Sequence, residues 1–141
     1  MPQIQINQVG LYYETVGAGE AVLFLHGFTG SGQDWANQMK AIQNKYQGIA
    51  LDLRGHGKSA APAEEKDYSI YLNCDDVYQL LNHLGIDRCC LVGHSMGGRY
   101  MTEFMRILRT TLGNPNATYA LLNPVVSKEH LTLFEGLGFG V

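Results

Sequence analysis

The chain has 141 residues and a mass of 15.6 kDa, which is enough for one ordinary domain with a real core. Its hydrophobic fraction of 45% and charged fraction of 16% are typical of a globular protein and exclude a disordered one. The net charge of −3 argues against a nucleic-acid partner, which would require a strongly basic surface.

Strand and helix patterns alternate along the first half of the chain. Ile4 and Ile6 alternate with polar residues, and Leu-Tyr-Tyr follows Gly10, so residues 3–16 predict a hairpin-like pair of strands. The apolar run 21–25 predicts a strand buried on both faces, and residues 48–53 predict another. Between them, apolar residues spaced four, three and four predict a helix: Trp35, Met39, Ile42 and Tyr46.

The alternation continues beyond a polar loop. A second helical stripe begins after Ser69, a favoured N-cap residue, and ends at Gly85; it comprises Ile70, Cys74, Val77, Leu81 and Leu84. Residues 89–92 predict a buried strand, residues 101–112 a helix, and residues 118–126 are compatible with one more strand. This order indicates an α/β fold: a mostly parallel sheet with helices on both faces and an antiparallel strand pair at its N-terminus.

Membrane and secretory features are not visible in the sequence. The longest purely apolar stretches have about five residues, whereas a membrane-spanning helix needs roughly 20. The N-terminus lacks the basic and apolar regions of a signal peptide. The three cysteines have no zinc-ligand spacing and are interpreted as reduced core thiols. We therefore expect a cytoplasmic protein with no membrane partner.

The strongest chemical signal lies between the strand 89–92 and the helix that follows it. Residues 93–98 read Gly-His-Ser-Met-Gly-Gly, which matches the nucleophile-elbow pattern G-x-S-x-G. A serine on such a strand-to-helix turn lifts its Oγ clear of the sheet, and the next amide points into the same space. The pattern predicts Ser95 as the nucleophile and the Met96 amide as one donor of an oxyanion hole.

A second signal follows the strand 21–25, where residues 26–30 read His-Gly-Phe-Thr-Gly. An oxyanion hole needs a second backbone donor, and the amide of Phe28 is the candidate. His26 could be a catalytic base, but we favour a role in orienting this loop through hydrogen bonds. A simple turn at the end of a strand is the alternative interpretation.

A third motif, Asp-Leu-Arg-Gly-His-Gly-Lys-Ser at residues 52–59, follows the strand 48–53. It lacks the spacing of a phosphate-binding loop, and no helix follows it directly. We interpret it as a structural turn.

In this order and at these spacings, the three motifs resemble the N-terminal half of an α/β-hydrolase-fold enzyme over about residues 1–110. Within that superfamily, residues 25–35 and 93–99 resemble the menaquinone-pathway synthase that makes 2-succinyl-6-hydroxy-2,4-cyclohexadiene-1-carboxylate. That enzyme eliminates pyruvate with a serine, histidine and aspartate triad. The resemblance implies one hydrolase domain over residues 1–141, in which the cap and the C-terminal strands are absent.

The same resemblance implies roles for single residues. Ser95 would be the nucleophile or base, and the amides of Phe28 and Met96 would be the oxyanion donors. Arg99, one turn after the elbow, would bind a substrate carboxylate. His26 and His94 are further candidates for substrate binding. A small-molecule substrate is implied, with no metal and no organic cofactor.

The acid and the base of a triad are less clearly marked. In this fold they follow the serine in the order acid and then histidine. His130 is the one histidine after Ser95, and no aspartate follows that serine. Glu135 could orient His130, whereas Glu129 is its sequence neighbour and is poorly placed to do so. His130 could equally be an exposed loop residue.

Three functions are therefore left open. The first is a serine enzyme that acts on a small acyl, ester or carboxylated substrate, with the pyruvate-eliminating reaction as one version. The second is a non-catalytic hydrolase fragment that binds small acids or self-associates, forming a homodimer through an exposed sheet edge or by strand exchange. The third, a nucleotide-binding domain, is disfavoured because no G-x-G-x-x-G follows the first strand.

Overall fold

The computed structural model describes residues 3–6, 8–86, 89–94 and 118–122. In chain order its elements are β1 (Gln3–Ile6), β2 (Val9–Val16), β3 (Glu20–Leu25), the 3₁₀ turn η1 (Gly32–Trp35), α1 (Ala36–Ile42), β4 (Tyr46–Leu51), the 3₁₀ turn η2 (Glu65–Tyr68), α2 (Ile70–His83), β5 (Cys89–His94) and β6 (Thr118–Leu122). The expected helix at 101–112 and residues 123–126 of the expected last strand lie outside the described residues.

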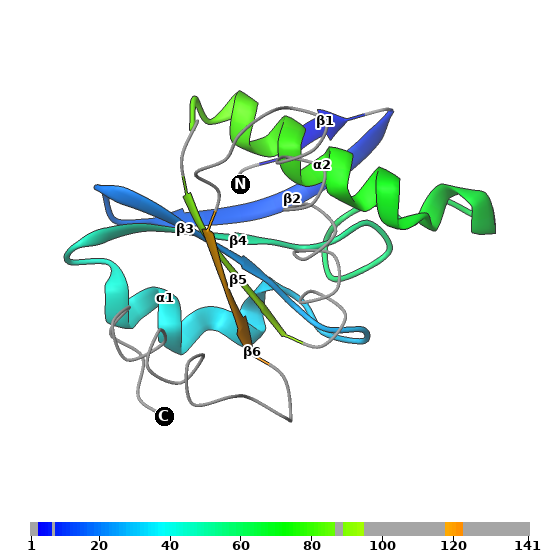
Figure 1. Ribbon diagram of the computed structural model, residues 1–141. Helices are drawn as coiled ribbons and strands as arrows, with labels where there is room; N and C mark the ends of the chain where they lie inside the picture. Colours follow the sequence, from blue (N-terminus) through cyan, green and yellow to red (C-terminus); the bar gives the residue numbers. More distant parts are fainter. Residues whose placement is uncertain (1–2, 7, 87–88, 95–117, 123–141) are drawn as a thin grey trace.

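One mixed sheet organises these elements (Figure 1). Its strand order is β1-β2-β4-β3-β5-β6. β1 and β2 pair antiparallel, and so do β2 and β4, whereas β4, β3, β5 and β6 are parallel to one another. The α/β class, the mostly parallel sheet and the antiparallel strand pair at the N-terminus are confirmed.

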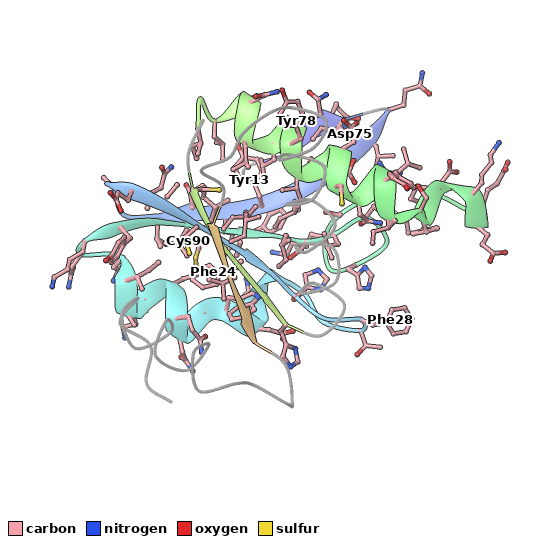
Figure 2. The ribbon with its side chains drawn as sticks, in the orientation of Figure 1. Tyr13, Phe24, Phe28, Asp75, Tyr78 and Cys90 are labelled. Atoms are coloured by element: carbon pink, nitrogen blue, oxygen red, sulfur yellow. The ribbon has the colours of Figure 1, made fainter. Side chains whose placement is uncertain are left out.

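The central strand β3 shows why residues 21–25 are continuously apolar. Leu23 and Leu25 belong to the hydrophobic cluster that packs against α2, whereas Val22 and Phe24 belong to the cluster that packs against α1. Successive side chains of a strand point to opposite faces, so a strand covered on both sides buries every position. Figure 1 shows α1 and α2 on opposite sides of the sheet, and Figure 2 shows Phe24 and Cys90 on the α1 side.

The second helix forms as its sequence predicts. The Ser69 hydroxyl accepts a hydrogen bond from the Leu72 amide at 3.1 Å and caps the first turn of α2. After the last turn, Gly85 adopts a φ of +70°, a conformation that glycine reaches without steric cost. Neither α2 nor any other helix within the described ranges is long and apolar enough to cross a membrane.

The first helix is shorter than its apolar spacing predicts. α1 ends at Ile42, and the Lys45 amide donates to the Ile42 carbonyl in the turn that follows. Tyr46 was expected on the helical stripe but instead begins β4, which also starts two residues earlier than predicted. Its side chain still packs with the α1 cluster, so a residue at the start of a strand mimics one more helical position.

Candidate active site

Three parallel strands, β3, β4 and β5, end at the same edge of the sheet, and the loops that follow β3 and β4 begin there. β3 lies between β4 and β5, with Leu25 opposite both Leu51 and Gly93. His94 is the exposed last residue of β5, and Ser95 is the next residue in the chain. In open α/β sheets this edge is where ligands bind. The topology therefore brings the loop at residues 26–31 beside the strand that leads into Ser95.

His26 holds the loop after β3. The imidazole is 1% exposed, and its Nε2 accepts the Leu53 amide at 3.0 Å. The proton is therefore on Nδ1, which donates to the Gly27 carbonyl oxygen at 2.7 Å. Backbone groups use both ring nitrogens, so the structure gives His26 the loop-orienting role and leaves no ring nitrogen for a substrate.

The same hydrogen bond sets the direction of the Phe28 amide. The Gly27 carbonyl and the Phe28 N–H belong to one peptide unit, which is planar and trans. Because the carbonyl points at the His26 ring, the Phe28 N–H points the opposite way. Gly30 also donates its amide to the Gly27 carbonyl at 3.1 Å, so two hydrogen bonds hold this peptide in place.

The tip of this loop is strained and exposed. Thr29 has a φ of +67°, which is unusual for a β-branched residue. The Phe28 side chain is 68% exposed and projects from the loop, as Figure 2 shows. The Phe28 and His56 rings form a T-shaped contact with 5.9 Å between their centroids, and the His56 and His26 centroids lie 4.9 Å apart. These ring contacts connect the loops after β3 and β4.

Asp52 ties the loop after β4 to the loop after β3. Its Oδ1 accepts the Gly32 amide at 2.6 Å, and its Oδ2 accepts the Lys58 amide at 2.9 Å. Gly57 has a φ of +51°, and a Cβ there would lie 2.2 Å from the Asp52 carboxylate. These contacts support the interpretation of residues 52–59 as a structural turn.

Arg54 lies in the same loop and is bound to α2. It is 2% exposed, and its Nε and Nη2 each donate to one oxygen of the fully buried Asp76 at 2.7 Å. A third N–H, on Nη1, donates to the Asp67 carbonyl at 2.8 Å. The hydrogen bonds to Asp76 raise the pKa of Arg54; burial raises the pKa of Asp76, and Arg54 opposes that rise.

The cysteines are not candidate nucleophiles. Burial raises the pKa of Cys89 to about 12 and that of Cys90 to about 11, and Cys74 is fully buried. A thiol reacts as its thiolate, which these two groups do not form at neutral pH. Among the residues that the structure describes, no group of three or more histidine, cysteine or acidic side chains could hold a metal ion.

The predicted site residues divide into two sets. Phe28, His26 and His94 lie together at the carboxyl-terminal edge of the sheet. The others lie outside the described residues: Ser95, Met96, Arg99, His130 and Glu135. Sequence analysis did not identify the ion pair between Arg54 and Asp76. The sequence feature that could have indicated this pair is Asp76 itself, because it lies next to Val77 on the apolar face of the predicted helix.

Burial of His26 makes stability depend on pH. Burial lowers the pKa of its imidazole below the ordinary 6.5; the Gly27 hydrogen bond raises it, His56 lowers it, and Asp52 and Asp34 raise it. As the pH falls, the His26 imidazole is therefore protonated in the unfolded chain before it is protonated in the folded one. The free energy of unfolding decreases as the pH drops below about 6.5. Urea unfolding between about pH 7 and about pH 5 should show this fall. H26Q should lose the part of this fall that comes from His26. If the free energy of unfolding fell equally with pH in both proteins, His26 would not be its source.

Comparison with known proteins identifies the fold. Residues 20–107 match the family described as alpha/beta hydrolase fold. The chain is 37% identical over 99 residues to epoxide hydrolase 4 of Mus musculus, covering 67% of this chain and 28% of that protein. It is 35% identical over 136 residues to an epoxide hydrolase of Caballeronia sordidicola, covering 94% of this chain and 40% of that protein.

Solved structures give the same result. A crystal structure of an epoxide hydrolase from Vigna radiata matches with a TM-score of 0.77 and 28% identity, over 86% of this chain and 38% of that one. The M145A mutant of an epoxide hydrolase from Bacillus megaterium matches with a TM-score of 0.76 and 32% identity, over 86% of this chain and 41% of that one. The chain thus spans well under half the length of these relatives, which are named as epoxide hydrolases and not as the menaquinone-pathway synthase.

Proposed function

Because this chain belongs to the α/β hydrolase fold family, we propose that it is a serine hydrolase that cleaves esters of small carboxylic acids. The observation that carries this proposal is the junction of two neighbouring strands. β5 leads directly into Ser95, and β3, beside it, leads into a loop whose Phe28 amide is held in one direction. A nucleophile and an oxyanion donor from adjacent strands are the two parts that acyl transfer needs first.

The reaction would proceed by acyl transfer through a covalent intermediate. The Ser95 Oγ attacks the acyl carbon while a base removes its proton, and the carbonyl oxygen becomes an oxyanion. The Phe28 and Met96 amides stabilise that charge, each contributing about 3 kcal/mol. The leaving alcohol takes up the proton, and water then attacks the acyl-enzyme and releases the acid. We assign the base to His130, oriented by Glu135, or to a histidine of a second chain.

The identity of the nucleophile favours esters over epoxides, although the relatives are named as epoxide hydrolases. Attack of the Ser95 oxygen on an epoxide carbon would join enzyme and substrate through an ether. An ether has no carbonyl that water can attack, so such an enzyme would stop after one turnover. Attack on an ester gives an acyl-serine, which water hydrolyses.

Charge at this edge bears on which acids would bind. Arg54 is paired with Asp76, and the Lys58 ammonium lies 4.8 Å from the centre of the Tyr12 ring. We therefore assign any contact with a substrate carboxylate to Arg99, with His94 beside the nucleophile. A pyruvate-eliminating reaction on a substrate with several carboxylates would use the same serine and amides. Because Arg54 is paired with Asp76 and Lys58 contacts the Tyr12 ring, we place the pyruvate-eliminating reaction second to ester hydrolysis.

Covalent labelling tests the proposal directly. Folded protein treated with a fluorophosphonate should gain the mass of one adduct, located at Ser95 by peptide mapping, because a phosphonylated serine mimics the tetrahedral intermediate. The same protein should hydrolyse p-nitrophenyl acetate and leave styrene oxide unchanged. Failure to label and failure to turn over the ester would overturn the proposal and favour a non-catalytic domain that binds small acids or self-associates.

A further inference from the structure

The buried Arg54–Asp76 pair is connected to the candidate oxyanion amide through consecutive contacts. Arg54 and Leu53 are adjacent, and the Leu53 amide donates to His26 at 3.0 Å. His26 in turn donates to the Gly27 carbonyl at 2.7 Å, and that carbonyl shares its peptide unit with the Phe28 N–H. The position of the backbone at Leu53 therefore affects the direction in which the Phe28 amide points.

The arrangement of the pair is specific in direction as well as in charge. A planar guanidinium that donates to both oxygens of Asp76 and to the Asp67 carbonyl can occupy only one orientation. Apolar residues of similar volume often stabilise a core as well as a buried ion pair does. These three hydrogen bonds connect the loop after β4 to α2 and to the segment just before it in one defined orientation.

We propose that Arg54 and Asp76 are positioning residues for the oxyanion hole: the pair anchors the loop after β4 to α2, and this loop holds His26 and the Phe28 amide in the catalytic direction. The expected effect on kcat rests on the proposed function, whereas the expected effect on the position of His26 does not. Neither residue touches the substrate. Their contribution is to the orientation of an amide that acts in the transition state, so it should affect kcat and not KM.

The test is a double variant in which both charges are replaced by apolar side chains, R54M/D76L. The ester hydrolysed is p-nitrophenyl acetate. We expect kcat to fall at least about tenfold while KM stays unchanged, because a small misplacement of a catalytic group lowers the rate strongly. R54K, which keeps the charge but loses the planar fork, should fall between the double variant and the wild type and serves if the double variant does not fold. K66Q is the matched control, since its ion pair with Glu64 is exposed.

A second measurement tests the link between the ion pair and His26 without relying on enzymatic activity. In ¹⁵N NMR the wild-type His26 should show the tautomer with its proton on Nδ1, assigned by the loss of its signals in H26Q. The double variant, or R54K in its place, should show a mixture of tautomers as the Leu53 hydrogen bond weakens.

Each outcome has a distinct meaning. A folded double variant with wild-type kcat and a wild-type tautomer would overturn the inference. A wild-type protein inactive on esters, with the tautomer still altered in the variant, would overturn the proposed function and support the positioning role. A lower kcat with an unaltered tautomer would contradict the route through His26.

Discussion

Replacing Ser95 by alanine is expected to lower kcat for ester hydrolysis by about 10⁴-fold or more and to abolish labelling by a fluorophosphonate. The hydroxyl supplies the bond to the acyl carbon, and neither the thiols of β5 nor the Ser59 hydroxyl is suited to replace it. Cys89 and Cys90 are protonated at neutral pH, and Ser59 is buried with its hydroxyl bonded to the Asp52 carbonyl. Initial rates with p-nitrophenyl acetate and intact-mass analysis are the measurements.

The control for that variant is another serine-to-alanine change, S69A. Ser69 caps α2, so its loss should cost about 1 kcal/mol of stability. It should leave kcat at the wild-type value, because the cap lies outside the proposed site. Ester hydrolysis or labelling that survives in S95A would assign the chemistry to a different nucleophile.

Removing one partner of the buried ion pair is expected to cause the largest loss of stability. D76A should lower the free energy of unfolding by about 3–5 kcal/mol, because it leaves the Arg54 guanidinium buried without a counter-charge. The loss should be visible as a lower urea midpoint with an unchanged denaturant slope.

An exposed ion pair provides the comparison for D76A. Lys66 and Glu64 lie 3.3 Å apart with most of both side chains in solvent, so E64A should change stability by less than about 1 kcal/mol. A loss of stability in D76A no larger than that in E64A would contradict this prediction. It would mean that water reaches the Arg54 guanidinium once Asp76 is removed.

Local patterns predicted the fold because each pattern reports one physical requirement. Continuous apolar residues in β3 follow from helices on both faces of the sheet, as Val22 and Leu23 show by packing on opposite sides. Ser69 predicted the start of α2, because few residues besides serine, threonine, asparagine and aspartate satisfy the free amides of a first turn. Tyr46 was misassigned because apolar spacing records which residues share a core and not which element carries them.

The candidate site was predicted less completely, since its parts come from separate loops. The pattern at residues 93–98 and the His-Gly-Phe segment each marked one loop, and neither marked Asp76, which lies on a helix. The link from Asp76 through Arg54 and Leu53 to His26 joins three segments of the chain. Sequence spacing contains no information on such contacts until the strands have been placed side by side.

The sequence alone thus determined the alternation of strands and helices, the two loops that carry the proposed nucleophile and oxyanion donor, and the family to which the chain belongs. Those properties depend on neighbours within a few residues. Tertiary structure alone decided that His26 binds the Leu53 amide and that Arg54 faces Asp76, because these partners are 27 and 22 residues apart in the chain. Burial and direction are properties of packed segments, and they determine whether a histidine orients a loop or binds a substrate.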